Sequence, residues 1–104
     1  MTRFRLTRVA ETDLEDLVRH IEHESGPERA RAVLADLLEA ALLVADAPGA
    51  GHPRPDLTEA PVRFWSVHRF LVVYRPETRP VEIVRILHGA RSPGVLGRAV
   101  RGME

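Results

Sequence analysis

The chain has 104 residues, carries no cysteine, has no net charge at pH 7 and contains 44% hydrophobic residues. This length suits one small domain with a hydrophobic core, and the lack of cysteine excludes disulfides, thiol catalysis and cysteine-ligated metals. No apolar run reaches the length of a membrane span, and no signal-peptide core precedes the first acidic residues, so we expect a cytoplasmic protein that does not bind membranes.

The charge is divided between the two halves of the chain. Residues 1–47 hold six arginines and ten acidic residues, whereas residues 48–104 hold nine arginines and five acidic residues, and there is no lysine. A protein that binds nucleic acid in general is usually basic overall. The balance therefore argues against direct DNA binding by this chain alone, although its second half has enough arginines for a local basic face.

The first predicted elements are a short strand at residues 3–7 and a helix that begins after Thr7. The Thr7 hydroxyl can accept hydrogen bonds from the free backbone N–H groups at a helix start. Apolar residues then recur at the spacing of one helix face: Ala10, Leu14, Leu17, Val18 and Ile21. We expect the opposite face, which includes Asp13, to lie in water.

A break and a second helix follow. Gly26 can end the first helix, and Pro27 suits the first turn of the next, where its missing N–H is not needed. Ser25 and Glu28 fit a capping box. The second helix shows the clearest periodicity in the chain, so the two helices should form an antiparallel hairpin.

The second half of the chain predicts a long loop, three strands and a tail. The loop at residues 48–61 contains four prolines and two glycines, which argue against regular structure. The three strands are expected at residues 62–67, 70–75 and 81–88. A two-residue hairpin favours Gly, Asn or Asp, so we expect a bulge or a wider turn at His68-Arg69. The tail, from about residue 92, can form a short helix.

The predicted order is β-α-α-β-β-β within a single domain, residues 1–104. The helical hairpin must bury its apolar face, and the natural partner is one face of an antiparallel sheet, which gives an α+β fold. The last strand is apolar on both alternations: Val81, Ile83 and Leu87 on one, Val84 and Ile86 on the other. Its second face should therefore be covered by the tail or by a partner.

Arg85 is the least expected residue of this last strand. By simple alternation it shares a face with Val81, Ile83 and Leu87, and a buried guanidinium requires a partner because it cannot lose its charge. Two interpretations stay open: a structural ion pair with an acid from a helix, or a contact to a phosphate or carboxylate of a ligand.

The end of the same strand carries His88 and Arg91, separated by two small residues. A histidine and an arginine at a strand end could do acid–base work on a phosphate group, or could simply cap and hydrogen-bond the structure.

Aromatic residues lie among arginines in the strand region. Trp65 lies close to Arg63 in the sequence, and Tyr74 lies between Arg69 and Arg75. Aromatic residues among arginines occur in sites that bind single-stranded RNA, but also in ordinary cores, where the aromatic ring is buried and its polar end is not. On the first helix, His20 and His23 lie among acids without a convincing third ligand, so no metal site is expected. The sequence shows no phosphate loop and no serine nucleophile motif.

Several stretches together resemble the RelE/ParE toxins of bacterial type II toxin–antitoxin systems. They are "ETDLEDLVRHI", "PGAGHPRPDL", "VRFWSVHRFLVVYR" and "VEIVRILHGARS". The resemblance runs from Phe4 to Arg91, and the ending "RILHGAR" is most similar to the ParE branch. It implies the same fold, no cofactor, and a cognate antitoxin, ParD-like or similar, whose C-terminal segment folds onto the toxin and could cover the second sheet face. Antitoxin-binding residues would then be Trp65, Val84 and Ile86.

Two activities occur in the resembled superfamily. RelE-like members cut messenger RNA on the ribosome with basic sheet residues and a histidine or tyrosine near the C-terminus, whereas ParE-like members inhibit DNA gyrase by binding. This chain has no lysine for the basic loop positions and no tyrosine in its tail, which favours a ParE-like gyrase inhibitor that is not an enzyme. The residues implied for target binding are Arg69, Tyr74, Arg85, His88 and Arg91.

The alternatives are a ribosome-dependent endonuclease and an antitoxin-binding module without toxicity. For the endonuclease, the catalytic candidates are Arg63, Arg85, His88 and Arg91, which could stabilise a phosphorane-like transition state and move a proton.

Overall fold

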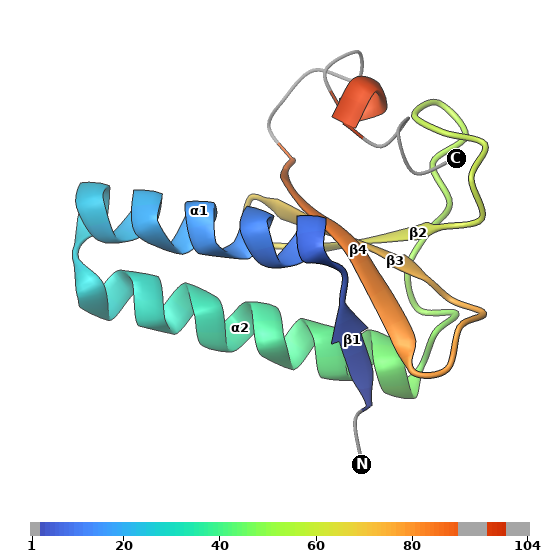
Figure 1. Ribbon diagram of the computed structural model, residues 1–104, viewed down its shortest axis with the longest axis horizontal. Helices are drawn as coiled ribbons and strands as arrows, with labels where there is room; N and C mark the ends of the chain where they lie inside the picture. The colour runs from blue at the N-terminus through green and yellow to red at the C-terminus, as the bar shows by residue number, and fades with distance from the viewer. Residues whose placement is uncertain (1–2, 90–95, 100–104) are drawn as a thin grey trace.

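The structure is a computed structural model that describes residues 3–89 and 96–99. Its elements are β1 (Phe4–Leu6), α1 (Arg8–Ser25), α2 (Pro27–Asp46), β2 (Arg63–Val67), β3 (Phe70–Arg75) and β4 (Val81–His88) (Figure 1). This confirms the α+β class and the order β-α-α-β-β-β. Residues 96–99 are helical, and the rest of the predicted tail helix lies outside the described residues.

Local signals place both helices. The Thr7 hydroxyl accepts a hydrogen bond from the backbone N–H of Ala10 at 3.2 Å, as its N-cap position predicts. Gly26 separates the helices with φ +90°, a conformation that favours glycine, and Pro27 begins α2. The capping-box prediction is wrong, because Gly26 itself is the N-cap of α2 and has no side chain to bond. No helix of the described part of the chain is long and apolar enough to cross a membrane.

The four strands form one sheet in the order β1-β4-β3-β2. Strands β2, β3 and β4 form an antiparallel meander, and β1 pairs in parallel with β4. The turn between β2 and β3 has only two residues, since Val67 pairs with Phe70, so the prediction of a wider turn is wrong. His68 adopts φ +54° there, and its Nε2 lies 2.6 Å from an Asp36 carboxylate oxygen on α2. Histidine tolerates this conformation better than most residues, and the contact holds it in place.

A β-bulge changes which way the last strand faces. Arg85 pairs with Val73 but Ile83 pairs with Tyr74, so Val84 is an extra residue in β4. Simple alternation therefore fails at this point, and the prediction that Arg85 shares a face with Ile83 is wrong. Arg85 instead lies on the face of Val73, at a place where β4 bends.

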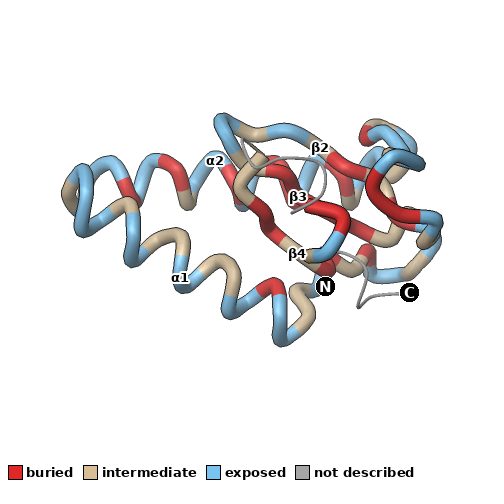
Figure 2. Tube along the Cα trace, turned by 90° about the horizontal axis from the view of Figure 1, so that it is seen from above, coloured by how far each residue is buried: buried red, intermediate tan, exposed pale blue. Residues whose placement is uncertain are grey.

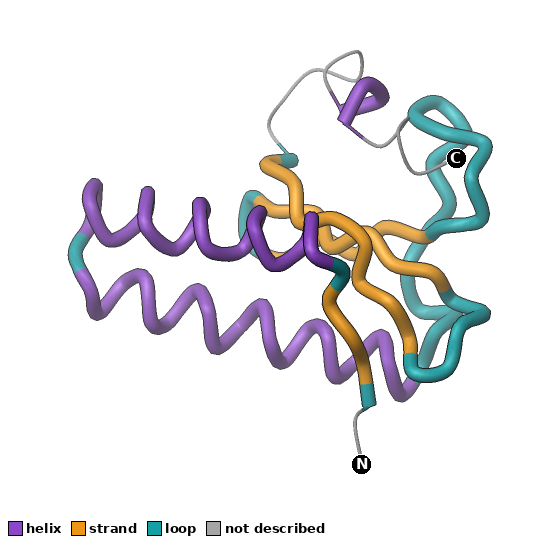
Figure 3. Tube along the Cα trace, in the orientation of Figure 1, coloured by secondary structure: helices purple, strands orange, loops and turns teal. Residues whose placement is uncertain are grey.

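Each face of the sheet has its own apolar cluster, and buried residues concentrate in β3 and β4 between the two covers (Figure 2). The helix-side core comprises Ala10, Val33, Leu37, Ala41, Val44, Val72, Tyr74, Val81, Ile83 and Ile86. The loop-side core comprises Leu57, Val62, Phe64, Leu71, Val73, Val84, Leu87 and Leu96. The expected tail cover is present through Leu96, whereas the loop cover through Leu57 was not predicted. That loop lies at the opposite end of the molecule from the turn between the helices (Figure 3).

Candidate functional site

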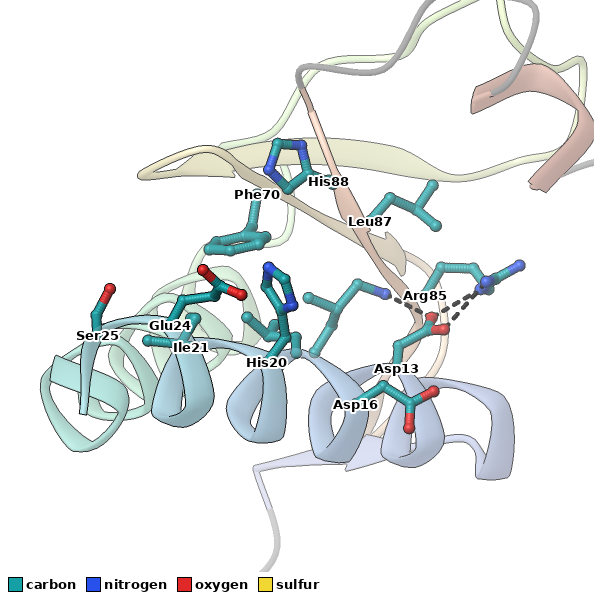
Figure 4. Close-up of a pocket in the computed structure, with 12 residues that line it drawn as sticks. Asp13, Asp16, His20, Ile21, Glu24, Ser25, Phe70, Arg85, Leu87 and His88 are labelled. Carbon is teal, nitrogen blue, oxygen red and sulfur yellow. Dashed lines mark hydrogen bonds and ion pairs between the residues drawn. The ribbon is translucent and has the colours of Figure 1, made fainter. Parts of the chain in front are cut away.

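Arg85 is held by an acid from a helix, as one of its two interpretations predicted. Its Nε donates to Asp13 Oδ2 at 2.7 Å, and its Nη2 donates to Asp13 Oδ1 at 3.0 Å (Figure 4). The same Asp13 Oδ2 accepts the backbone N–H of Ile86 at 3.0 Å. The third guanidinium nitrogen, Nη1, donates to the carbonyl oxygen of Ala99 at 2.6 Å. One arginine therefore ties α1, β4 and the helical turn at 96–99 together.

This arrangement decides what Arg85 can do. All three of its nitrogens already donate to protein acceptors, and only 21% of its side chain is exposed. A bidentate arginine–carboxylate pair is strong and fixed in direction. Arg85 is therefore a structural residue in this fold, and a contact with a target would have to compete with Asp13. Asp13 was expected in water, but only 15% of its side chain is exposed. Two features of the sequence could have indicated this pair: an acid at the edge of the apolar helix face, and an arginine without an obvious partner in the last strand.

A second group of residues meets where the β2–β3 turn approaches the end of β4. We call it the hairpin-end cluster: Arg69, Phe70, His88 and Gly89. The Gly89 N–H donates to the carbonyl oxygen of Arg69 at 2.6 Å, and the rings of Phe70 and His88 meet edge to face with centroids 5.4 Å apart. The Arg69 side chain is exposed, so the cluster presents a positive charge beside an aromatic pair.

Tyr74 anchors the other end of β3 and does not reach the surface. It is fully buried, its hydroxyl donates to the carbonyl oxygen of Pro48 at 2.7 Å, and it accepts the Gly51 N–H at 2.8 Å. Burial raises the pKa of this phenol. A Cβ on Gly51 would lie 2.6 Å from the Tyr74 hydroxyl oxygen, so only glycine fits there without movement. The Tyr74 hydroxyl is thus already bonded within the protein, and a role for Tyr74 in target binding stays a prediction.

The described catalytic candidates do not all come together, because Arg85 and His88 line one groove whereas Arg63 lies elsewhere. Arg63 pairs with Tyr74 across the sheet and donates to the Gly51 carbonyl oxygen at 2.8 Å, whereas His88 pairs with Phe70. Those two positions lie four residues apart along β3, about 13 Å at the rise of a β-strand. Arg91 lies outside the described residues. The described candidates are thus spread over both ends of the sheet rather than gathered around one reacting group.

The predicted antitoxin-binding residues lie in different places as well. Val84 and Ile86 are 2% and 8% exposed and belong to the loop-side and helix-side cores respectively. The second face was expected to be covered by the tail or by a partner, and in the structure the protein's own loop covers it together with Leu96. Trp65 is half-buried against the helix-side core and lines a shallow hollow beside Leu43 of α2. Their role in antitoxin binding stays a prediction.

The described side chains offer no group of metal ligands. Within residues 3–89 and 96–99, no three His, Asp or Glu side chains lie close enough to hold a metal ion.

Comparison with known proteins gives matches over most of the chain. A family model described as the ParE toxin of type II toxin–antitoxin system, parDE, matches residues 4–93. Toxin ParE1 of Caulobacter vibrioides is 35% identical over 88 residues, which cover 85% of this chain and 90% of that protein. A solved chain of the chromosomal ParDE TA system from P. aeruginosa is 26% identical with a TM-score of 0.68, and the match covers 82% of this chain and 92% of that one.

Proposed function

Because the chain belongs to the family of ParE toxins of type II toxin–antitoxin systems, we propose that it inhibits DNA gyrase by binding and that a ParD-like antitoxin neutralises it. The resemblance to the ParE branch is confirmed by these matches, and so is the role as the toxin of such a system. Beyond this role, we propose that the target is gyrase and that the protein acts in the cytoplasm.

One observation supports inhibition by binding over RNA cleavage. Among the described residues, Arg63 and His88 lie at opposite ends of β3, and Arg85 is committed to Asp13. General acid–base catalysis needs its groups within hydrogen-bond reach of one substrate. A binding surface has no such requirement, because separate residues can contact separate parts of a large partner.

The surface that best fits a target contact is the hairpin-end cluster. The Arg69 side chain is exposed and forms no hydrogen bond or ion pair with another described residue. Phe70, the next residue in the chain, and His88 add an edge-to-face aromatic pair. Arginine and aromatic side chains are the residue types that dominate the energy of protein interfaces. Arg85 then contributes indirectly, by fixing the strand that carries His88.

The direct test is a gyrase supercoiling assay with the purified chain, with and without its co-encoded antitoxin. We expect inhibition that the antitoxin reverses, and we expect Arg69→Ala to weaken inhibition about tenfold, the loss of one good interface contact. The matched control is Arg79→Ala. Arg79 is also an exposed turn arginine, but it lies in the β3–β4 turn, where it donates to the carbonyl oxygens of Pro76 and Thr78.

The other outcomes separate the alternatives. Cleaved messages in cells that express the chain, with gyrase unaffected, would make it a ribosome-dependent endonuclease. Tight antitoxin binding without growth arrest would make it an antitoxin-binding module without toxicity.

A further inference from the structure

The turn between β2 and β3 carries a residue that its backbone conformation does not favour. His68 has φ +54°, and it is the only residue other than glycine with a positive φ in the described part of the chain. A two-residue hairpin turn normally places glycine, asparagine or aspartate at such a position, because a larger side chain crowds the backbone there. Glycine would suit the fold better, so the histidine has to be explained by what its side chain contacts.

The side chain of His68 contacts α2. Its Nε2 lies 2.6 Å from Asp36 Oδ2, and the ring nitrogen donates because an ionised carboxylate can only accept. The side chain of His68 is 33% exposed and that of Asp36 is 49% exposed. A pair this open to water adds little to the free energy of unfolding. Its main effect is therefore geometric, since it ties the tip of the β2–β3 hairpin to the helix.

The next residue of the turn, Arg69, is held from the other side. Its carbonyl oxygen accepts the Gly89 N–H at 2.6 Å, at the end of β4. A Cβ on Gly89 would lie 3.2 Å from this oxygen, so the lack of a side chain permits the close approach. The backbone of the turn is thus fixed between α2 and β4. The Arg69 side chain is exposed and forms no hydrogen bond or ion pair with another described residue.

We propose that Asp36 and His68 are positioning residues for target binding, because their contact fixes the turn in the conformation in which the target binds Arg69. The inference rests on the proposed function, in which Arg69 of the hairpin-end cluster contacts gyrase. A turn that is already ordered loses less conformational freedom when it binds. Part of the affinity for the target then depends on two residues that need not touch it.

The same helix offers a matched control three residues further along. Glu39 lines the same shallow hollow as Asp36 and His68 and carries the same charge as Asp36. It forms no hydrogen bond or ion pair with another described residue. Loss of a negative charge beside the turn is therefore common to both substitutions, whereas loss of the contact with His68 follows only from a change at Asp36.

The test is the gyrase supercoiling assay with the full chain and its variants. We expect His68→Gly and Asp36→Ala each to raise the concentration for half-inhibition about fivefold, the cost of ordering the turn on binding. The double variant should be no weaker than either single one, because all three remove one contact. Asp36→Asn keeps an acceptor for the ring N–H, so its inhibition should stay within about twofold of the wild-type chain, as should that of Glu39→Ala.

The melting temperature of His68→Gly separates positioning from a role in stability alone. Glycine adopts a positive φ without crowding, so we expect this variant to melt no lower than the wild-type chain although it inhibits less. Full inhibition by both His68→Gly and Asp36→Ala would overturn the proposal. An equally large loss in Glu39→Ala would also overturn it, because the effect would then be one of charge.

Backbone NMR relaxation of the free chain follows the turn without the target. Fast motion lowers the order parameter of an amide, so we expect the value for Arg69 to fall in Asp36→Ala and to stay unchanged in Glu39→Ala. An unchanged value in Asp36→Ala would overturn the positioning role. If the wild-type chain does not inhibit gyrase, the proposed function fails and this inference with it. If the wild-type chain and all variants inhibit gyrase equally, only the positioning role is wrong.

Discussion

On one face of the sheet the cover is a pair of helices, and on the other it is a proline-rich loop with a helical turn. The helices satisfy their own backbone hydrogen bonds, so they need only apolar contacts with the helix-side core. The loop has no such internal ladder and is fixed at a few points: Tyr74 binds Pro48 and Gly51, Arg63 binds Gly51, and His52 pairs with Phe64. We infer that the helix-side core is stabilised by packing spread over many residues, whereas the loop-side core depends on a small number of anchors.

The sharpest test of this difference is one truncation in each core. Ile83 is 1% exposed beneath the helices, and Leu57 is 7% exposed beneath the loop. We expect Ile83→Ala to lower the free energy of unfolding by about 4 kcal/mol and Leu57→Ala by about 2 kcal/mol, because a loop collapses into a cavity more easily than two helices do. Chemical denaturation of both variants measures this. Equal losses would show that the loop is as rigid a cover as the helices.

Asp13 tests a contact that joins the two sides, because Arg85 binds both Asp13 of α1 and Ala99 of the helical turn. Asp13→Asn keeps the shape of the side chain but removes the charge that Arg85 faces, so we expect a loss of about 2 kcal/mol, less than for a fully buried pair because both side chains are partly exposed. Asp16→Asn is the control, since its pair with Arg19 is 66% to 74% exposed and should matter by less than about 0.5 kcal/mol. Similar losses in the two variants would mean that Asp13 has no special structural role.

The helix-side cover was predictable because it is repetitive. A helix shows its buried face every three to four residues, so the positions from Ala10 to Ile21 indicated which side packs on the sheet. The loop-side cover has no period, and Leu57 is a single leucine among prolines, so nothing in its neighbourhood indicated that it is buried. The ion pair around Arg85 was likewise only partly predictable, because no repeating pattern indicates its partner. Arg85 was recognised as needing a partner, but Asp13 lies some 70 positions away in the sequence, and the bulge at Val84 depends on how β4 pairs with β3.

Tyr74 allows the anchoring of the loop to be followed by pH. It is the only tyrosine of the chain, and burial raises its pKa in the folded protein. Above about pH 10, the ordinary value, the unfolded chain loses this proton more readily than the folded one, so stability falls as pH rises through the folded pKa. We expect alkaline unfolding curves to show this fall together with tyrosinate absorbance.

The matched variant is Tyr74→Phe. It removes the titrating group and leaves the Pro48 carbonyl and the Gly51 N–H without their partner, so we expect it to cost about 1.5 kcal/mol at neutral pH. Its stability should then depend less on pH above the ordinary tyrosine pKa. An unchanged alkaline slope in this variant would assign the fall to other groups and contradict the role given to Tyr74.

The smallest effect is expected at the one ion pair within the loop itself. Arg54 donates to both carboxylate oxygens of Asp56, at 3.0 and 2.8 Å, and these hydrogen bonds lower the pKa of Asp56. A lowered folded pKa makes the pair stabilising above the ordinary aspartate value and lost as pH falls through the folded pKa. Asp56 lies in water, where such a pair is screened, so Arg54→Ala should leave the melting temperature at neutral pH unchanged. In an NMR titration the Asp56 midpoint should rise toward its ordinary value. A clear drop in melting temperature would instead mean that the loop is held by charge as well as by its buried anchors.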